Sequence, residues 1–468
     1  MHPAESWTFL LSGRSGSGDT EGLIMCIDPT PTRLATAVVL LASVSGAAHA
    51  LDARSLSLGG SAIANGEGAP GAFANPASLM AMQRRGEKVH VSLGVALETR
   101  DDAGVYDIAN DRDNETLEED IDAAVAEIDF STAEPDCLDD PTVACLEDLD
   151  GLGVLSARAL DILDSVDRSD ISGQATAALG LAFSNTPYPF AIHLQARGTG
   201  RGRVEASDAD RVYFEQFAST LADASLTRAE IEATGALTLE IDEDRRTGTI
   251  TVVSPEDQLT SGIEGGGLVR MTLGASIART VTIKGHDVDI GITPKLSSLL
   301  AQGVETTLDE EFGDGQSSED RFADSEVSDT SFSVDLGGSM RLTTHPIRLA
   351  AVLRNVVPES IETTEGVVFE TGPQLVVGGA WSREIFTVNA DLALNEADVD
   401  SFPTQVFALG GEVTKGPFAL RAGINHDFAR TESRTGLSLG LGLGPLEIGA
   451  RASAIEHLQA GAQVSLTF

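Results

Sequence analysis

Six histidines follow residue 50 and are the first residues to consider for acid–base catalysis or metal binding. Most stand singly near the ends of predicted strands, so we expect surface or turn roles for His90, His193, His286, His345, His426 and His457. Two of them precede an aspartate, in His286-Asp287 and His426-Asp427, but neighbours along a strand point to opposite faces and cannot cooperate. The chain contains no nucleophile elbow, phosphate loop or zinc-binding helix motif. The sequence therefore predicts neither catalytic residues nor a bound cofactor.

Two cysteines, Cys137 and Cys145, remain after residue 50 and are separated by seven residues. In an oxidising compartment such a pair can close a small loop, so we expect a disulfide between them. Zinc binding would require two further ligands nearby, and no histidine lies between His90 and His193. We therefore expect no metal site at these cysteines.

The segment 98–172 is strongly acidic, with 24 acidic and four basic residues between Glu98 and Asp170. Apolar residues recur at helical spacing in 115–130 and in 149–166, which favours a solvated, amphipathic helical insertion. A calcium-binding alternative would use Asp107, Asp111, Asp113 and Glu115. The EF-hand spacing with its turn glycine is absent, however, so the solvated insertion is the preferred interpretation.

The rest of the chain after residue 88 alternates apolar and polar residues with a period of two. In 331–342, Phe332 and Leu336 share one face while Ser333 and Asp335 share the other. The same alternation recurs in 286–292, 385–394 and 418–425. These segments are predicted to be strands with one apolar and one polar face.

The connections between these strands alternate between short and long. Tight turns such as Lys284-Gly285 and Gly444-Pro445 alternate with long segments such as 301–329 and 357–372. This alternation of short and long connections is typical of transmembrane barrels, whose strands all cross a similar hydrocarbon thickness. We predict an all-β protein, an antiparallel barrel of about fourteen strands (twelve to sixteen) over residues 88–468, with all long segments on one side. The range in the number of strands comes from a pair of short, charged candidate strands around 235–254.

The end of the chain carries a pattern that fits a barrel of the outer membrane. Val464, Leu466 and Phe468 alternate with polar residues, and a terminal Phe resembles the signal by which such proteins engage the barrel assembly machinery. We therefore expect assembly into outer-membrane lipid.

The first residues look like export signals. Met25 begins a short polar segment with Arg33, followed by an apolar run and by Ala48-His49-Ala50, a cleavage pattern. We expect 25–50 to be a signal peptide cut near Ala50, and 1–24 to be an over-called upstream extension. The net charge of −41 makes nucleic acid an improbable partner. The expected location is the outer membrane of a Gram-negative bacterium.

The segment 51–87 is rich in small residues and too irregular for a spanning strand, so it could lie inside the lumen. Its pattern SLGGxAxA…AxxANPAxL, over 55–79, resembles the N-terminal box of the long-chain fatty-acid transporter (FadL) family and its relatives. In that group Asn-Pro-Ala ends a plug-like segment, which implies a plug motif at Phe73, Asn75, Pro76 and Ala77. We also expect Asn75 to hold its turn through hydrogen bonds to the backbone.

Within that group the chain is most similar to the TraF-type outer-membrane proteins of conjugal transfer. The likeness includes the acidic insertion, GITPKL at 291–296, AVLRNVVPES at 351–360 and ALGGEVTKGPFALRAGIN at 408–425. It implies a structural or accessory barrel, with a conjugation apparatus as its partner. Two other functions are kept open: a FadL-like passive channel for small or hydrophobic molecules, and an exported soluble β protein.

Overall fold

The computed structural model describes residues 52–101, 169–212, 260–307, 318–342, 344–429, 435–454 and 457–468, with short pieces of 102–168 and 213–259. The expected disulfide between Cys137 and Cys145 and the calcium alternative at Asp107, Asp111, Asp113 and Glu115 lie outside the described residues. Most of the expected helical insertion also lies outside them.

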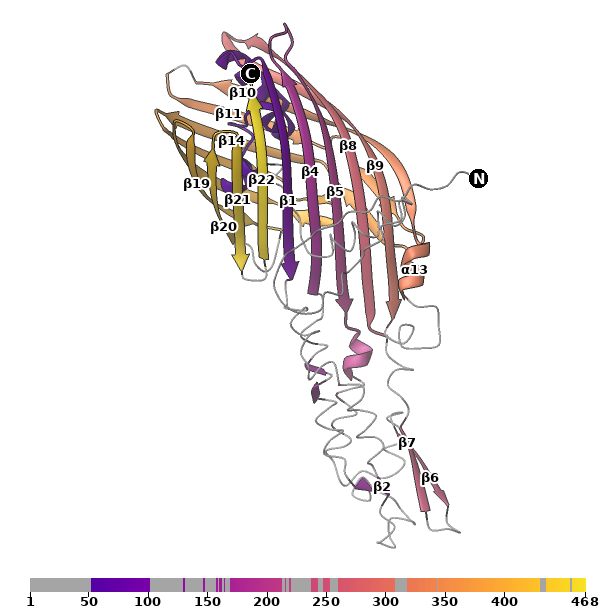
Figure 1. Ribbon diagram of the computed structural model, residues 1–468. Coiled ribbons are helices and arrows are strands. Elements are labelled where there is room, and N and C mark those ends of the chain that lie inside the picture. The colour runs from indigo at the N-terminus through magenta and orange to yellow at the C-terminus, as the bar shows by residue number, and fades with distance from the viewer. Residues whose placement is uncertain are drawn as a thin grey trace, which may run out of the picture.

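Within the described residues, fourteen antiparallel strands form a closed barrel (Figure 1), which confirms the predicted fold. The barrel closes because β1 pairs with β4 on one side and with the last strand, β22, on the other. The strands are β1 (Val89–Asp101), β4 (Ser169–Phe183), β5 (Phe190–Glu205), β8 (Gly262–Ile283), β9 (His286–Thr307), β10 (Val327–Arg341), β11 (Ile347–Arg354), β14 (Gln374–Arg383), β15 (Phe386–Ala393), β18 (Val406–Lys415), β19 (Phe418–Asp427), β20 (Thr435–Leu443), β21 (Leu446–Ala454) and β22 (His457–Thr467).

Alternation along the strands places apolar side chains on the outside of the barrel and polar ones inside. On β20, Leu437, Leu439 and Leu441 are 66%, 67% and 62% exposed, whereas Ser438 between them is 2% exposed. On β10, Phe332 is exposed and Ser333 is buried, as the period of two predicts. An apolar outer surface around a polar lumen is the arrangement of outer-membrane barrels, so the chain is a transmembrane barrel of that type.

Short and long connections fall at opposite ends of the barrel, as the alternation predicted. One end, called the short-turn end, carries tight turns such as Lys284-Gly285, where both residues have positive φ, of 51° and 82°. That backbone geometry is typical of two-residue hairpin turns. The other end, the long-loop end, carries the long segments. The doubtful pair near 235–254 forms a separate hairpin of β6 (Leu237–Asp242) and β7 (Thr247–Val252), which explains why the barrel has fourteen strands.

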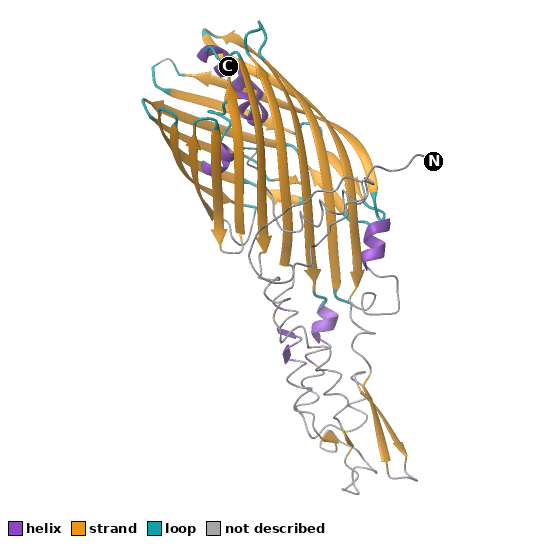
Figure 2. Cartoon of the chain, in the orientation of Figure 1, coloured by secondary structure: helices purple, strands orange, loops and turns teal. Residues whose placement is uncertain are grey.

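The barrel wall is much taller on one side than on the other (Figures 1 and 2). Strands β8 and β9 have 22 residues each, whereas β11 and β15 have eight. A tilted strand of about 9–11 residues crosses a bilayer, so the long wall, β1 to β10 of the barrel, extends beyond the lipid.

Because the strands of the long wall extend beyond the lipid, two boundaries differ from those predicted. The predicted connection 301–329 begins later, because β9 continues to Thr307 and helix α13 (Ser318–Asp324) precedes β10. The strands β1 and β4 likewise enter both ends of 98–172. Glu98 at the start of this range faces the lumen, where it pairs with Arg451 at 3.6 Å.

Two long connections fold back into the lumen as small hairpins at the long-loop end. The first contains β12 (Glu359–Glu362) and β13 (Val368–Thr371), and the second contains β16 (Ala397–Val399) and β17 (Phe402–Thr404). Phe369 of the first is 1% exposed and packs with Val367, Leu268 and Leu299. The alternation of connection lengths predicted only a long loop at 357–372, and did not indicate either hairpin. We call them the inward hairpins.

The remaining described elements are short. No described helix is long and apolar enough to cross a membrane. Two further pieces of strand, β2 (Asp129–Phe130) and β3 (Leu146–Glu147), pair only with each other in the described sheets.

Candidate functional site in the barrel lumen

Residues 52–86, called here the N-terminal segment, form a chain of short helices. These are α2 (Ala53–Ser57), α3 (Gly68–Ala74), the 3₁₀ helix η1 (Pro76–Ser78) and α4 (Leu79–Arg85). Asp52 caps α2, because its carboxylate accepts a hydrogen bond from the Ser55 amide at 2.7 Å. Gly86 ends α4 in the left-handed conformation, with φ of 74°. The small residues of this segment thus form compact turns of helix rather than a strand.

The N-terminal segment lies inside the barrel. It contacts each of the fourteen described barrel strands, and a segment can do so only from the lumen. The wall residues that it meets include His90, Ala182, His193, Ala278, Asp289, Gly338, Arg348, Val376, Asp391, Glu412, Gly423, Gly440, Gly449 and Gly461. Figures 1 and 2 show its helices within the barrel, toward the end that carries the C-terminus.

Glycines on the inner face of the wall let the backbones meet directly. A Cβ atom placed on Gly410 would lie 2.6 Å from Leu58, and one on Gly423 would lie 2.4 Å from the Gly59 amide nitrogen. Gly449 similarly approaches the Ala53 carbonyl, since a Cβ there would lie 2.5 Å from its oxygen. Any side chain at these positions would collide with the backbone of the N-terminal segment. The inner face of the wall is therefore complementary in shape to the N-terminal segment.

The Asn-Pro-Ala turn fits the wall in the same way. Asn75 Oδ1 accepts a hydrogen bond from the Ala77 amide at 3.0 Å, and Asn75 Nδ2 donates to the Ile63 and Gly338 carbonyls at 3.0 and 3.3 Å. Asn75 is fully buried. Its side chain thus ties one turn of the segment to an earlier part of the segment and to β10. Pro76 lies against Gly291 and Gly337 of the wall.

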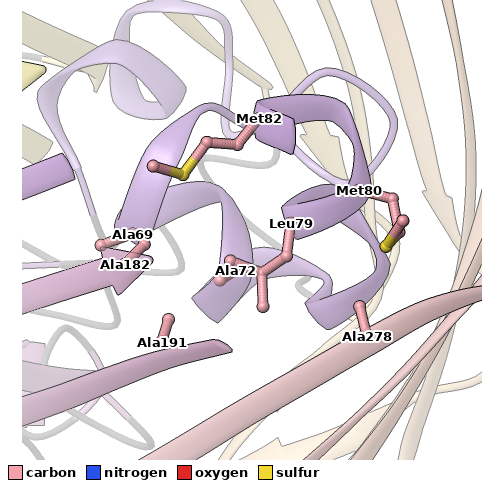
Figure 3. Packing of buried hydrophobic residues seen from close by; sticks show 8 residues of the cluster. All are labelled: Ala69, Ala72, Leu79, Met80, Met82, Ala182, Ala191 and Ala278. Atoms are coloured by element: carbon pink, nitrogen blue, oxygen red, sulfur yellow. The ribbon is translucent and has the colours of Figure 1, made fainter. Parts of the chain in front are cut away.

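An apolar cluster holds the segment near the short-turn end of the long wall. Figure 3 shows side chains of α3 and α4 directed toward small residues of β4, β5 and β8. The buried members are Ala69, Ala72, Leu79, Met80, Met82, Ala182, Ala191 and Ala278. Alanines on the wall leave room for Leu79 and the methionines, and removing a fully buried Leu side chain costs about 2–5 kcal/mol. Small wall residues thus receive apolar side chains of the segment here, as the wall glycines receive its backbone elsewhere.

Buried ion pairs fix the opposite side of the segment. Arg54 donates two hydrogen bonds to the Glu412 carboxylate, at 3.1 and 3.0 Å. Glu412 also pairs with Arg421, which in turn bonds Glu447 at 2.9 Å. Burial alone would lower the pKa of Arg54, but Glu67 and Glu412 raise it above its ordinary value. Arg54 is therefore charged at any physiological pH.

Charged side chains of the wall also bind the backbone of the segment. Asp391 accepts hydrogen bonds from the Ala62 and Ile63 amides at 2.7 and 3.0 Å. Arg348 donates to the Ala64 carbonyl at 3.3 Å, and Arg84 of the segment pairs with Asp289. The bonds from Asp391 and Arg348 satisfy backbone groups that a chain without sheet partners would leave unpaired.

Two of the histidine predictions were wrong. His90 and His193 are 6% and 2% exposed, rather than at the surface or in turns. They lie at inward positions of β1 and β5, where His90 Nδ1 accepts a hydrogen bond from the Ala69 amide at 3.2 Å. The His193 ring lies 3.5 Å from the Phe73 ring, centre to centre. In the part of the chain that the structure describes, no cluster of His, Cys, Asp or Glu is placed to hold a metal ion.

The three residues of the expected assembly signal lie on the outer surface beside the seam of the barrel. Val464 and Leu466 pair with Leu93 and Val91 of the first strand. The terminal Phe468 is 70% exposed, and its amide donates to the Val89 carbonyl at 2.9 Å. The last residues of the chain therefore close the barrel against the first strand.

Sequence reasoning missed the wall residues that receive the segment. Asp391 lies in the strand predicted at 385–394, but no partner was predicted for it, and neither Glu412 nor the inward glycines were singled out. The doublets Gly378-Gly379 and Gly410-Gly411 were a usable signal, because glycine inside a strand often marks close approach of another backbone.

The comparisons with known proteins concern both sequence and fold. A family profile described as "F plasmid transfer operon, TraF, protein" matches residues 72–392. No curated protein matches the chain. Among solved structures, the TodX monoaromatic hydrocarbon channel deltaS2 mutant aligns with a TM-score of 0.46 and 12% identity, over 90% of this chain and 98% of that chain.

Two further structures have similar coverage. The toluene transporter TbuX of Ralstonia pickettii aligns with a TM-score of 0.43 and 11% identity, over 89% of this chain and 97% of its own. A FadL homologue of Pseudomonas aeruginosa aligns with a TM-score of 0.36 and 10% identity, over 89% of this chain and 98% of its own. The family profile, which covers more than half of the chain, identifies its family.

Proposed function

Because the chain belongs to the family of TraF proteins of the F plasmid transfer operon, we propose that it is a plugged, accessory barrel that serves a conjugation apparatus in the outer membrane. The N-terminal segment is the plug. The observation that supports this role is its contact with every described strand of the barrel, through backbone, apolar packing and buried ion pairs. A plug held in this way favours a structural barrel over an open pore.

The polarity of the lumen favours the same role over a duct for hydrophobic molecules. Inward positions carry buried charges such as Glu412, Arg421, Asp289 and Arg348. A hydrophobic solute passing these groups would displace their hydrogen-bond partners, at about 1–3 kcal/mol for each group left unpaired. The FadL-like passive channel is therefore the weaker candidate.

The test is conductance in planar bilayers, with and without the N-terminal segment. Deletion of 53–80 should leave a barrel that assembles, because the seam formed by β1 and β22 is intact. It should raise the conductance well above that of the full-length protein. Deletion of the β6–β7 hairpin, 237–252, which lies outside the barrel sheet, is the matched control and should leave conductance unchanged. Equal conductance of the full-length and 53–80 deletion proteins would contradict the plug.

The role in conjugation needs its own test, in the bacterium that encodes the chain. Donor cells without the gene should transfer DNA less often, and the gene restored in trans should rescue transfer. Unchanged transfer would contradict that role while leaving the plugged barrel untouched.

The orientation and processing of the chain complete the proposal. The long-loop end faces the cell exterior and the short-turn end, with Phe468, faces the periplasm. The signal peptide is cut near Ala50, which leaves Asp52 close to the new N-terminus as the cap of α2. Protease added to intact cells should cut first within 98–172, and the mass of the mature protein should correspond to a start at Leu51. First cleavage at 415–417 would reverse the orientation.

The proposed partners follow from the surface of the barrel. Outer-membrane lipid covers its apolar outer face, and the barrel assembly machinery engages Val464, Leu466 and Phe468. We propose no enzymatic activity.

A further inference from the structure

A cavity of about 110 Å³ lies in the lumen between the N-terminal segment and the inward hairpins. Phe73 of the N-terminal segment borders it on one side, and Glu359 and Val399 of the inward hairpins border it on the other. His193 and Arg197 belong to the barrel wall around it. A cavity of this size has room for several water molecules or for one small polyatomic ion. We call it the chamber.

The chamber is rich in cations although the protein carries a net charge of −41. Its lining includes Arg197, Arg270, Lys295 and Arg354. Among the described residues Arg354 makes no ion pair, and its Nη2 donates only a long hydrogen bond of 3.4 Å, to the Ala74 carbonyl.

The carboxylates of the chamber are already engaged. Asp335 pairs with Lys295 at 2.8 Å and also accepts a hydrogen bond from the Asn355 amide at 2.8 Å. Glu359 pairs with Arg270 and accepts a hydrogen bond from the Ser331 hydroxyl at 2.8 Å. The acceptors that the chamber possesses are thus bound to its own donors.

Two of the arginines stand directly opposite each other across neighbouring strands. Arg197 of β5 is in register with Arg270 of β8, an arrangement in which like charges repel. Asp400, at the turn of the second inward hairpin, lies between them, 3.3 Å from Arg197 Nη1 and 2.6 Å from Arg270 Nη2. The arginine pair thus already binds one carboxylate, which the chain itself supplies.

Donors remain even after Asp400 is bound. Among the described residues, three buried donors of the chamber lining have no hydrogen-bond partner: Gln195 Nε2, Arg197 Nε and Arg270 Nε. The buried His193 Nδ1 also has none there, and it donates in one of the two tautomers of the ring. No side-chain oxygen of the lining is left in that state. His193 is 2% exposed, so solvent does not reach it freely. A buried donor without an acceptor costs about 1–3 kcal/mol, so the lining favours a ligand rich in acceptors.

The neighbouring cavity of the lumen has the opposite character. Its lining includes Asp391 and Asn425, whose Oδ1 atoms are acceptors that have no partner within the described part of the chain. The chamber therefore differs from this neighbouring cavity in having unpartnered donors and no unpartnered side-chain acceptor among the described residues.

We propose that the chamber binds a small oxyanion, a carboxylate or a phosphate, with Arg197 and Arg270 as its principal ligands. Asp400 competes for the same pair of guanidinium groups. This inference concerns binding only and does not depend on whether the barrel serves conjugation.

The test uses the full-length protein in detergent, titrated by calorimetry at constant ionic strength. The probes are inorganic phosphate in one arm and acetate in the other. Saturable one-to-one binding of phosphate, of acetate or of both is expected, and the arms show which oxyanion the chamber accepts. No saturable binding in either arm would overturn the proposal.

Variants locate the binding. Arg270→Gln and Arg197→Gln should each weaken it at least tenfold, whereas Arg383→Gln, on an exposed arginine at the end of β14, should leave it unchanged. Asp400→Asn should tighten it, because the competing carboxylate is removed. Heat-modifiable gel mobility checks that each variant forms a barrel, and two arginine variants guard against one that does not fold. Equal weakening by Arg383→Gln, or an affinity that Asp400→Asn does not raise, would overturn the assignment to the arginine pair.

Discussion

Alanine in place of Gly410 should loosen the N-terminal segment without disturbing the barrel around it. The added Cβ would lie 2.6 Å from Leu58 Cβ and from the Leu58 carbonyl oxygen, against 3.4–4 Å for an ordinary contact. The segment must therefore move by about 1 Å, and overpacking of this kind costs roughly 1–3 kcal/mol. Gly410 does not have a positive φ, so its own backbone accepts alanine.

The assay is hydrogen exchange of the Ala62 and Ile63 amides, which Asp391 holds. Exchange through local opening speeds up tenfold for every 1.4 kcal/mol or so, which gives an acceleration of roughly 5-fold to 150-fold in Gly410→Ala. Gly411→Ala, one residue along the same strand, is the control, because nothing lies within 4 Å of a Cβ there. Equal exchange rates in the two variants would refute the idea that the wall glycines seat the segment.

Three further predictions concern charge, acid and closure of the barrel. Glu412→Gln leaves Arg54 buried without its main partner and should weaken docking of the segment by about 3–5 kcal/mol, seen as a higher bilayer conductance; Glu384→Gln in an exposed turn should have no effect. Burial would raise the pKa of Asp210, but hydrogen bonds from Ser261 and Thr260 lower it below 3.8. The Asp210 carboxylate therefore stabilises the junction between 206–212 and 260–261 above pH 3.8, and this stabilisation is lost as the pH falls below that value. Proteolysis of the junction should accordingly become faster at low pH, and this pH dependence should be absent in Asp210→Asn. Removal of Phe468 takes away the hydrogen bonds that join the chain end to Lys88 and Val89, so the heat-modifiable, assembled fraction should fall; an unchanged fraction would contradict the seam as the site of closure.

The barrel could be predicted from the sequence because its signals are local. The alternation of apolar and polar residues in 331–342 or 418–425 depends only on which face of the strand contacts lipid. Turns such as Lys284-Gly285 can be recognised from their residue types. The excess length of β8 and β9 could not be read in this way, because a strand beyond the lipid need not keep an apolar outer face.

The contents of the lumen were harder to predict because they depend on contacts far apart in sequence. Asn75 could be placed in a turn from its neighbours alone, but its bond to Gly338 joins residues 263 positions apart. Arg54 and Glu412 are 358 positions apart, and nothing near either residue indicates the other. The inward hairpins were missed for a similar reason. Segments 357–372 and 395–403 are polar enough for surface loops, and the burial of Phe369 depends on Leu268 and Leu299 of distant strands.

The contact of the N-terminal segment with every strand also sets an order of events in time. The segment precedes β1 in the chain and so leaves the ribosome before every barrel strand, yet its contacts with Gly449 and Gly461 require the last two strands. Contacts of such large sequence separation form slowly, because the intervening chain must be ordered before they contribute. The N-terminal segment, made before the barrel, is therefore the last part to reach its final position. Until then its apolar residues, Leu56, Leu79 and Met82 among them, must be shielded from aggregation by something other than the barrel.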